Sequence, residues 1–205
     1  MLHSLYEDIY AAGKWEDLWF QWKGKPLILA YPEALKDDEY DQEIASFFTF
    51  KPVEPTYGTP ENTSNLWGWL SLFPQAKYGP LSATGRVEQM TVSPAQNATF
   101  DGVLTAMNST NVRGRSYTVA NGYTGNATDL LYGKNFQEQW DRVLEIDPEF
   151  VFVTGWNEWV AMRQENWEGT ENAFADTFSA EYSRDLEPSK GVLKDYYYFQ
   201  LCQNI

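Results

Sequence analysis

The sequence contains almost no histidine and almost no cysteine. The only histidine of the 205 residues is His3, at the extreme N-terminus, so Ser-His-Asp hydrolysis and His-ligated zinc chemistry have almost nothing to work with. Cys202 is the only cysteine, which excludes an intramolecular disulfide, and its position in an aromatic segment near the C-terminus indicates packing. Catalysis, if this chain carries any, must therefore rest on carboxylates.

Basic residues and long apolar runs are also scarce. The 15 basic residues face 29 acidic ones, for a formal net charge of -14, whereas binding to a phosphate backbone needs clustered Lys and Arg. Nucleic acid is therefore not an expected partner. The chain as given shows no apolar run long enough for a membrane helix and no signal peptide at its start, so we expect no membrane span.

Aromatic side chains, in contrast, are abundant, with 9 Trp, 13 Tyr and 12 Phe. Many of them are expected in the core of a single domain that covers residues 1–205. Rings in loops rich in Gly, Pro and Asn, or at the ends of strands, are candidates for stacking on a ligand. This group comprises Tyr31, Trp67, Trp69, Trp156, Trp159 and Trp167, and about half of it is expected to be ordinary packing.

The hydrophobic pattern alternates between short apolar runs and longer periodic segments. Apolar runs predict strands at 26–31, 46–51, 87–93 and 150–153, and helical spacing predicts helices at 5–23, 37–45, 133–146 and 192–201. The segment 52–84 is rich in Pro, Gly, Asn and Trp, and a loop of this length in a compact domain is usually functional or disordered. Its aromatic content favours function.

Strands that alternate with loops and helices are typical of α/β folds with a parallel sheet. Reactive residues at the strand ends favour a parallel β/α barrel over an open sheet, because barrel sites gather at that end. Only four or five strands are visible where a barrel needs eight, so the sequence predicts a partial, half TIM-like barrel. Such a half barrel exposes two strand edges, which predicts an edge-to-edge dimer or pairing with a missing N-terminal half.

The most informative stretch runs from Phe150 to Trp159, where an apolar strand leads into Trp-Asn-Glu-Trp. Glu158 lies between two indoles, and Asn157 can hydrogen-bond it or a ligand hydroxyl. Apolar walls raise the pKa of a carboxyl group, as a general acid requires, and flat aromatic faces suit a sugar ring. The stretch therefore indicates carbohydrate chemistry, the alternative being that both indoles are core packing and Glu158 is a solvated loop residue.

These residues carry a resemblance to a known family. Thr154–Trp159 followed by Phe174–Pro188 resembles the C-terminal part of the glycoside hydrolase family 99-like, or WbsX-like, barrels, and the segments 25–29, 48–51, 67–70 and 91–97 support the likeness. The resemblance implies a (β/α)8 barrel of which this chain supplies the fifth to the eighth strands, a sugar polymer as substrate, carboxylate acid/base chemistry, and a periplasmic or extracellular location. The family's Glu-Trp-His-Glu pair of carboxylates is missing here, so only Glu158 and its immediate neighbours can be matched.

Glycoside hydrolysis needs two carboxyl groups. Glu158 is the first candidate, as general acid, and its partner is Asp185, Glu187 or Glu181, or a residue of the missing half. Arg184 is a candidate substrate ligand or, alternatively, only the ion-pair partner of one of these carboxylates.

Hydrogen bonds to sugar hydroxyls are further expected from Lys51, Asn97 and Asn157, although Lys51 also fits an ordinary surface lysine. The acidic rim offers oxygen ligands of the kind that Ca2+ takes, but without the spacing of an EF-hand, so no cofactor is expected except possible Ca2+.

Three functional hypotheses remain open. The first is part of a glycoside hydrolase that cleaves a polysaccharide or glycan, and the second is a non-catalytic carbohydrate-binding barrel remnant that keeps the aromatic residues without a complete carboxylate pair. The third is a cell-surface polysaccharide biosynthesis protein, because the WbsX-like label is also attached to such gene sets. No phosphate-binding loop of the Gly-x-x-x-x-Gly-Lys type is present, which weakens any nucleotide-driven step.

Overall fold

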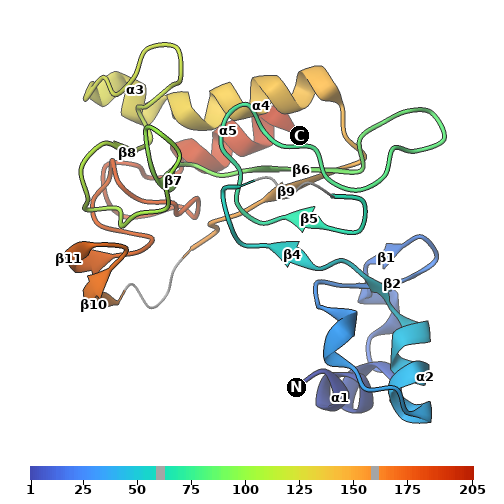
Figure 1. The fold of residues 1–205 in the computed structure, drawn as a ribbon. Helices are drawn as coiled ribbons and strands as arrows, with labels where there is room; N and C mark the ends of the chain where they lie inside the picture. Colours follow the sequence, from blue (N-terminus) through green and yellow to red (C-terminus); the bar gives the residue numbers. More distant parts are fainter. Residues whose placement is uncertain (59–62, 158–161) are drawn as a thin grey trace. The chain divides into compact units, whose positions relative to one another are not determined.

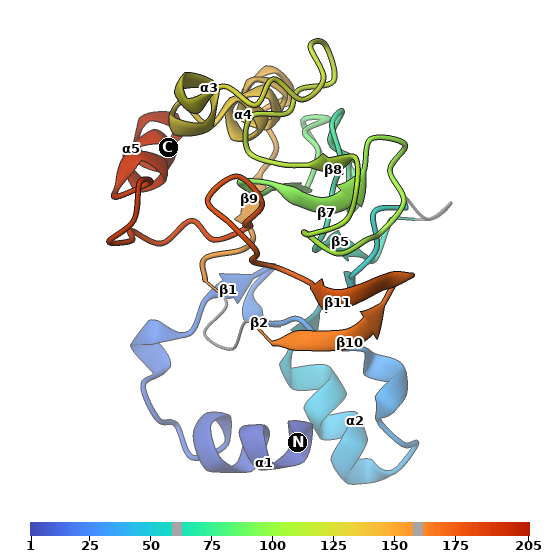
Figure 2. The same ribbon diagram turned by 90° about the vertical axis from the view of Figure 1, so that its left-hand side faces the viewer.

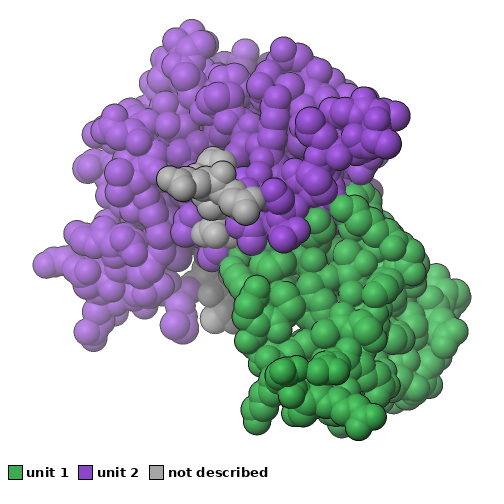
Figure 3. All heavy atoms as spheres, turned by 45° about the vertical axis from the view of Figure 1, so that its right-hand side comes forward, with its two compact units in different colours: residues 1–53 green, residues 54–205 purple. Residues whose placement is uncertain are grey.

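A computed structural model describes residues 1–58, 63–157 and 162–205. Glu158 and Trp159 therefore lie outside the described residues. The chain divides into two compact units, residues 1–53 and residues 54–205 (Figure 3). Each unit has a hydrophobic core of its own.

Unit 1 is a small mixed structure of short helices and a three-stranded sheet. Its elements are α1 (Leu2–Leu5), a π-helical turn (Tyr6–Tyr10), a 3-10 turn (Glu16–Leu18), β1 (Gln21–Trp22), β2 (Lys25–Ile28), a second 3-10 turn (Pro32–Ala34), α2 (Glu39–Phe47) and β3 (Thr49–Phe50) (Figure 1). Strand β2 pairs antiparallel with β1 and parallel with β3. Tyr6, Ile44 and Phe48 form the buried core between the helices.

The first helix predicted in unit 1 is wrong in extent. The sequence predicts one helix over 5–23, but helical structure from the N-terminus ends at Tyr10. Gly13 and Trp15 have positive φ angles of 63° and 56°, a left-handed conformation that a right-handed helix cannot continue through. The apolar spacing of this segment instead serves to pack Tyr6 and Tyr10 against α2.

Unit 2 holds the remaining elements. These are β4 (Val53–Glu54) at the boundary with unit 1, β5 (Trp67–Gly68), β6 (Gln89–Val92), β7 (Gln96–Thr99), β8 (Val112–Arg113), α3 (Ala127–Leu131), α4 (Lys134–Ile146), β9 (Phe150–Val153), β10 (Arg163–Trp167), β11 (Thr170–Phe174) and α5 (Tyr196–Asn204). Strands β6 and β9 form a parallel pair in which Gln89 lies opposite Phe150 and Val92 opposite Val153. Helix α4 directly precedes β9, and Figure 1 shows it running along the pair.

The core of unit 2 lies between this strand pair and the helices α4 and α5. Phe136, Trp140 and Val143 recur at helical spacing along one side of α4, and all three are buried, which confirms the helix predicted at 133–146. They pack with Met90 and Val92 of β6. Leu201 of α5 packs against the same cluster, together with the buried Leu186 and Tyr197.

Besides the two-stranded sheet of β4 and β5, two antiparallel pairs belong to this part of the chain. Strand β7 pairs with β8, and β10 pairs with β11 in a hairpin where Trp167 lies opposite Thr170. The two hairpin loop residues, Glu168 and Gly169, have φ angles of 47° and 74°, as a turn that matches the twist of its strands requires. Neither pair is expected from the hydrophobic pattern of the sequence.

The prediction of a parallel barrel is wrong. The described residues form small separate sheets, and β6–β9 is the one two-stranded parallel sheet among them. The reason lies at the other edge of β6, where Gln89 exchanges backbone hydrogen bonds of 3.0 and 3.1 Å with Tyr78 in an antiparallel bridge. Because the chain runs in the opposite direction there, the parallel order of a barrel is interrupted after two strands.

Candidate functional site

The end of β9 is clamped to a later segment by a glycine. Gly155 has a φ of 77°, and a Cβ at this position would lie 2.2 Å from the carbonyl oxygen of Arg184, so only glycine fits. The close approach lets the backbone N–H of Leu186 donate to the carbonyl of Gly155 at 2.8 Å and that of Glu187 to the carbonyl of Trp156 at 2.8 Å. The segment that follows Ser183 is thereby fixed against the strand end.

Side chains of this clamped segment alternate between two surroundings. Arg184 and Leu186 are buried, with Leu186 in the core of unit 2. Ser183, Asp185 and Glu187 instead line a pocket of about 260 Å3. We call this pocket the carboxylate pocket, and its other polar lining comes from Arg115, Thr177, Ser179 and Ser189.

Hydrogen bonds hold both carboxylates of the carboxylate pocket. Oδ2 of Asp185 accepts from Oγ1 of Thr177 at 2.7 Å and from Oγ of Ser183 at 3.2 Å. Oε2 of Glu187 accepts from Nδ2 of Asn157 at 2.6 Å. The second oxygen of Asp185, Oδ1, is buried and accepts no hydrogen bond from a described residue. Both carboxylates are thus oriented from one side and leave capacity for a ligand.

Arg115 is the buried cation of the carboxylate pocket. It is fully buried, with its guanidinium carbon 4.1 Å from the ring centre of Tyr197, and its Nη2 donates to Oγ of Ser183 at 3.3 Å and to the carbonyl of Asp185. Burial lowers the pKa of Arg115 below its ordinary value, although arginine remains charged in proteins. Arg115 therefore holds the backbone of Asp185 in place. Its role could not be predicted from the sequence, because an arginine in a Gly-rich loop belongs to no periodic pattern.

A second polar cluster forms around Arg184 of the clamped segment. Nη1 of Arg184 pairs with Oδ1 of Asp176 at 2.8 Å and lies 3.3 Å from Oδ1 of Asn97. The same Asn97 oxygen accepts from the hydroxyl of Tyr57 at 2.5 Å, and burial raises the pKa of this phenol to about 12. Arg184 and Asn97, both proposed from the sequence, do meet. Their contact and the ion pair to Asp176 indicate a structural role, in which Arg184 links three segments of the chain.

The remaining candidates from the sequence are scattered. Trp67 is buried and stacks on Phe150 with ring centres 4.7 Å apart, so its face is already covered. Trp69 and Trp156 are 40% and 46% exposed, and Trp167 is half-buried on β10. Trp69 contacts Phe152 and Trp156 contacts Tyr198, so only part of each ring is open to a ligand, whereas Trp67 is packing.

Three further candidates serve other contacts. Tyr31 and Lys51 belong to unit 1, where the hydroxyl of Tyr31 donates to the carbonyl of Val53 at 2.9 Å and Lys51 is buried, unlike a surface lysine. Oε1 of Glu181 accepts from the backbone N–H and the hydroxyl of Ser116 at 2.9 and 2.8 Å. Glu181 thus holds the loop of Ser116, and it does not line the carboxylate pocket.

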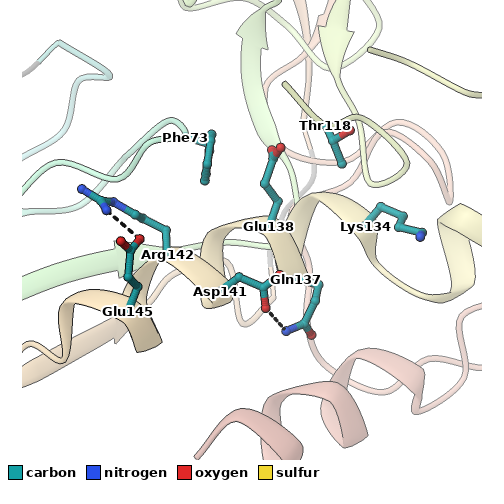
Figure 4. A pocket seen from close by; sticks show the side chains of 8 residues that line it. All are labelled: Phe73, Thr118, Lys134, Gln137, Glu138, Asp141, Arg142 and Glu145. Atoms are coloured by element: carbon teal, nitrogen blue, oxygen red, sulfur yellow. Dashed lines mark hydrogen bonds and ion pairs between the residues drawn. The ribbon is translucent and has the colours of Figure 1, made fainter. Parts of the chain in front are cut away.

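The cavity of about 420 Å3 along α4 has a different character (Figure 4). Several of its polar side chains contact one another, as Arg142 pairs with Glu145 at 2.7 Å and Asp141 accepts from Gln137 at 2.8 Å. Glu138 accepts from the backbone N–H of Val119, and burial raises its pKa. None of the described candidates from the sequence lines this cavity.

The described part of the chain shows no group of three or more His, Cys, Asp or Glu side chains placed to hold a metal ion. Among the helices described, none has the length and apolar character that crossing a membrane would need. Comparison of the chain with family models, with curated proteins and with solved structures found no match. The geometry of the carboxylate pocket is therefore the basis for assigning a function.

Proposed function

We propose that unit 2 binds a carbohydrate in the carboxylate pocket and hydrolyses a glycosidic bond there. The observation that carries this proposal is that Asp185 and Glu187 line one pocket together with several hydroxyl side chains and a buried arginine. Paired carboxylates are the minimum chemistry for glycoside hydrolysis, and hydroxyl side chains match the hydroxyls of a sugar. The likeness of Thr154–Trp159 and Phe174–Pro188 to the family 99-like enzymes supports the same substrate class.

We take inversion as the form of the proposed reaction, in which the two carboxyl groups lie on either side of the scissile bond with room for a water molecule. In this reaction water attacks the anomeric carbon as the bond to the leaving oxygen breaks. One carboxylate takes the proton from water while the other, as the acid, protonates the leaving oxygen.

Asn157 has a positioning role in this proposal. Its amide donates to one oxygen of Glu187, which fixes the carboxylate relative to the end of β9. Asn157→Ala is expected to lower kcat about tenfold, because the carboxylate loses its orientation but keeps its charge. Asn157→Asp is expected to be worse, since two carboxylates would then repel each other at this position.

The decisive measurement is reducing-sugar release from soluble polysaccharides. Asp185→Asn and Glu187→Gln should each lower turnover about 100-fold or more, and the double variant little further, because the two groups act as a unit. Glu165→Gln, at an exposed carboxylate on β10, is the matched control. Wild-type turnover in Asp185→Asn and Glu187→Gln would refute the catalytic pair. Binding without sugar release by the wild type would favour the non-catalytic alternative.

A further inference from the structure

A groove at the junction of α3, α4 and α5 exposes an unusual number of aromatic rings. It has a volume of about 410 Å3, and the residues that define it here are Tyr132, Lys134, Gln137, Tyr196, Phe199 and Gln203. We call it the aromatic groove. None of these residues lines the carboxylate pocket, so the two sites are separate on unit 2.

The three rings of the aromatic groove are exposed to solvent, and two of them share one face of a helix. Tyr132, Tyr196 and Phe199 are 69%, 48% and 57% exposed, although rings of this size ordinarily contribute to a core. Tyr196, Phe199 and Gln203 recur at positions i, i+3 and i+7 of α5, which places them along one face of that helix. Figure 2 shows α5 beside α3, whose C-terminal end carries Tyr132.

A network of side-chain amides holds the groove in shape. Oε1 of Gln137 accepts from Nε2 of Gln200 at 3.0 Å and from Nδ2 of Asn204 at 3.2 Å, and Nε2 of Gln137 donates back to Oδ1 of Asn204 at 3.2 Å. The hydroxyl of Tyr197 further ties α5 to the carbonyl of Leu130 at 2.6 Å. Because α5 is fixed to α3 and α4 in this way, the rings are positioned before any ligand binds, which lowers the entropy cost of binding.

Amide side chains supply most of the polar lining. Gln200 is 9% exposed, and besides its bond to Gln137 its Nε2 donates to the carbonyl of Gly133 at 3.3 Å. The lining therefore combines three aromatic faces, amide donors and acceptors, and a single charge on Lys134.

We propose that the aromatic groove is a saccharide-binding site that anchors a polysaccharide chain to unit 2. A sugar ring offers apolar C–H faces for the aromatic rings and hydroxyls for the amides, which matches a lining where both kinds of group alternate. A partner helix would instead need a continuous apolar groove, and Gln137, Gln200 and Gln203 interrupt one here. The site extends beyond the proposed hydrolysis and does not depend on it.

Native gel electrophoresis in gels that contain laminarin, mannan, xylan or alginate tests the proposal. The wild-type chain should be retarded by at least one of these polymers. Tyr132→Ala and Phe199→Ala should each weaken the apparent affinity about tenfold, because losing contact with about 56 Å2 of apolar surface corresponds to that factor. Tyr198→Ala, at a 41% exposed ring of the same helix that does not line the groove, should be retarded like the wild type.

The outcomes separate this site from the carboxylate pocket. Asp185→Asn/Glu187→Gln should lose hydrolysis and keep the retardation, so failure of one proposal leaves the other standing. No retardation of the wild type in any of the four gels would overturn the proposal, as would undiminished retardation of the Tyr132→Ala/Phe199→Ala variant. Light scattering identifies a competing occupant, because a dimer that dissociates on Phe199→Ala would show the groove to be an interface between copies. Far-UV circular dichroism confirms that each variant is folded.

Discussion

Replacing Gly155 with alanine should both destabilise unit 2 and displace the two carboxylates of the carboxylate pocket. The left-handed backbone at φ 77° costs a non-glycine residue about 1–2 kcal/mol. In addition, the new Cβ would lie 2.2 Å from the carbonyl oxygen of Arg184, below the 3.0 Å that real Cβ atoms keep, so the segment with Asp185 and Glu187 must move away.

That displacement stretches the two backbone hydrogen bonds, each 2.8 Å long, that Leu186 and Glu187 donate to the end of β9. At about 1 kcal/mol for each bond lost, the total destabilisation reaches about 3–4 kcal/mol. Urea unfolding followed by circular dichroism measures this as a lower free energy of unfolding.

Gly169→Ala is the matched control. Gly169 has a φ of 74°, nearly that of Gly155, but nothing lies within 4 Å of a Cβ added there. It should therefore lose only the backbone contribution of about 1–2 kcal/mol. If the two variants lose the same stability, the close approach of Gly155 to Arg184 is not what holds the segment, and the proposed geometry of the carboxylate pocket fails with it.

Three further predictions concern other parts of the chain. The backbone N–H of Lys36 lowers the pKa of Asp41. The stabilisation by this carboxylate is therefore complete above its ordinary pKa of 3.8 and is lost as the pH falls through the lower pKa of the folded state. Acid titration followed by circular dichroism should lack this loss in Asp41→Asn. Burial raises the pKa of Tyr57 to about 12, so the stabilisation by its neutral hydroxyl holds below pH 10 and is lost as the pH rises through about 12. In ultraviolet difference spectra, Tyr57→Phe should therefore show as many tyrosines ionising near pH 10 as the wild type. One tyrosine fewer in the variant would contradict the assignment. The edge of β9 opposite β6 should support association, and Val151→Pro, which removes a donor from that edge, should shift light-scattering masses toward the monomer; unchanged masses would count against edge pairing.

Local elements could be predicted from the sequence where the pattern was strong. The Phe-Val-Phe-Val run gave β9, and the spacing of Phe136, Trp140 and Val143 gave α4, because burial of one face demands these periods. The barrel could not be predicted correctly, because strand order depends on what occupies each edge. Tyr78, in a segment without a strand pattern, takes the edge of β6 that a barrel strand would need.

The candidate site could be predicted only in part from the sequence, for the same reason. Asp185, Glu187 and Asn157 were proposed from the sequence, and the structure brings them to one pocket or to a direct contact with it. Arg115 and Thr177 were missed, because they reach the pocket through loops whose course no local pattern specifies. Glu158, the first candidate, lies outside the described residues, so its role stays a prediction.

The alternation along Ser183–Glu187 also limits how this segment can change during evolution. Substitutions at single positions can alter the pocket or the core separately, because Asp185 and Glu187 line the pocket whereas Leu186 lies in the core. A one-residue insertion or deletion before Asp185 would instead exchange the two sides, placing a carboxylate in the core position of Leu186 and an apolar side chain in the pocket. Length variation among homologous sequences is therefore expected in the neighbouring loops and not within these five residues.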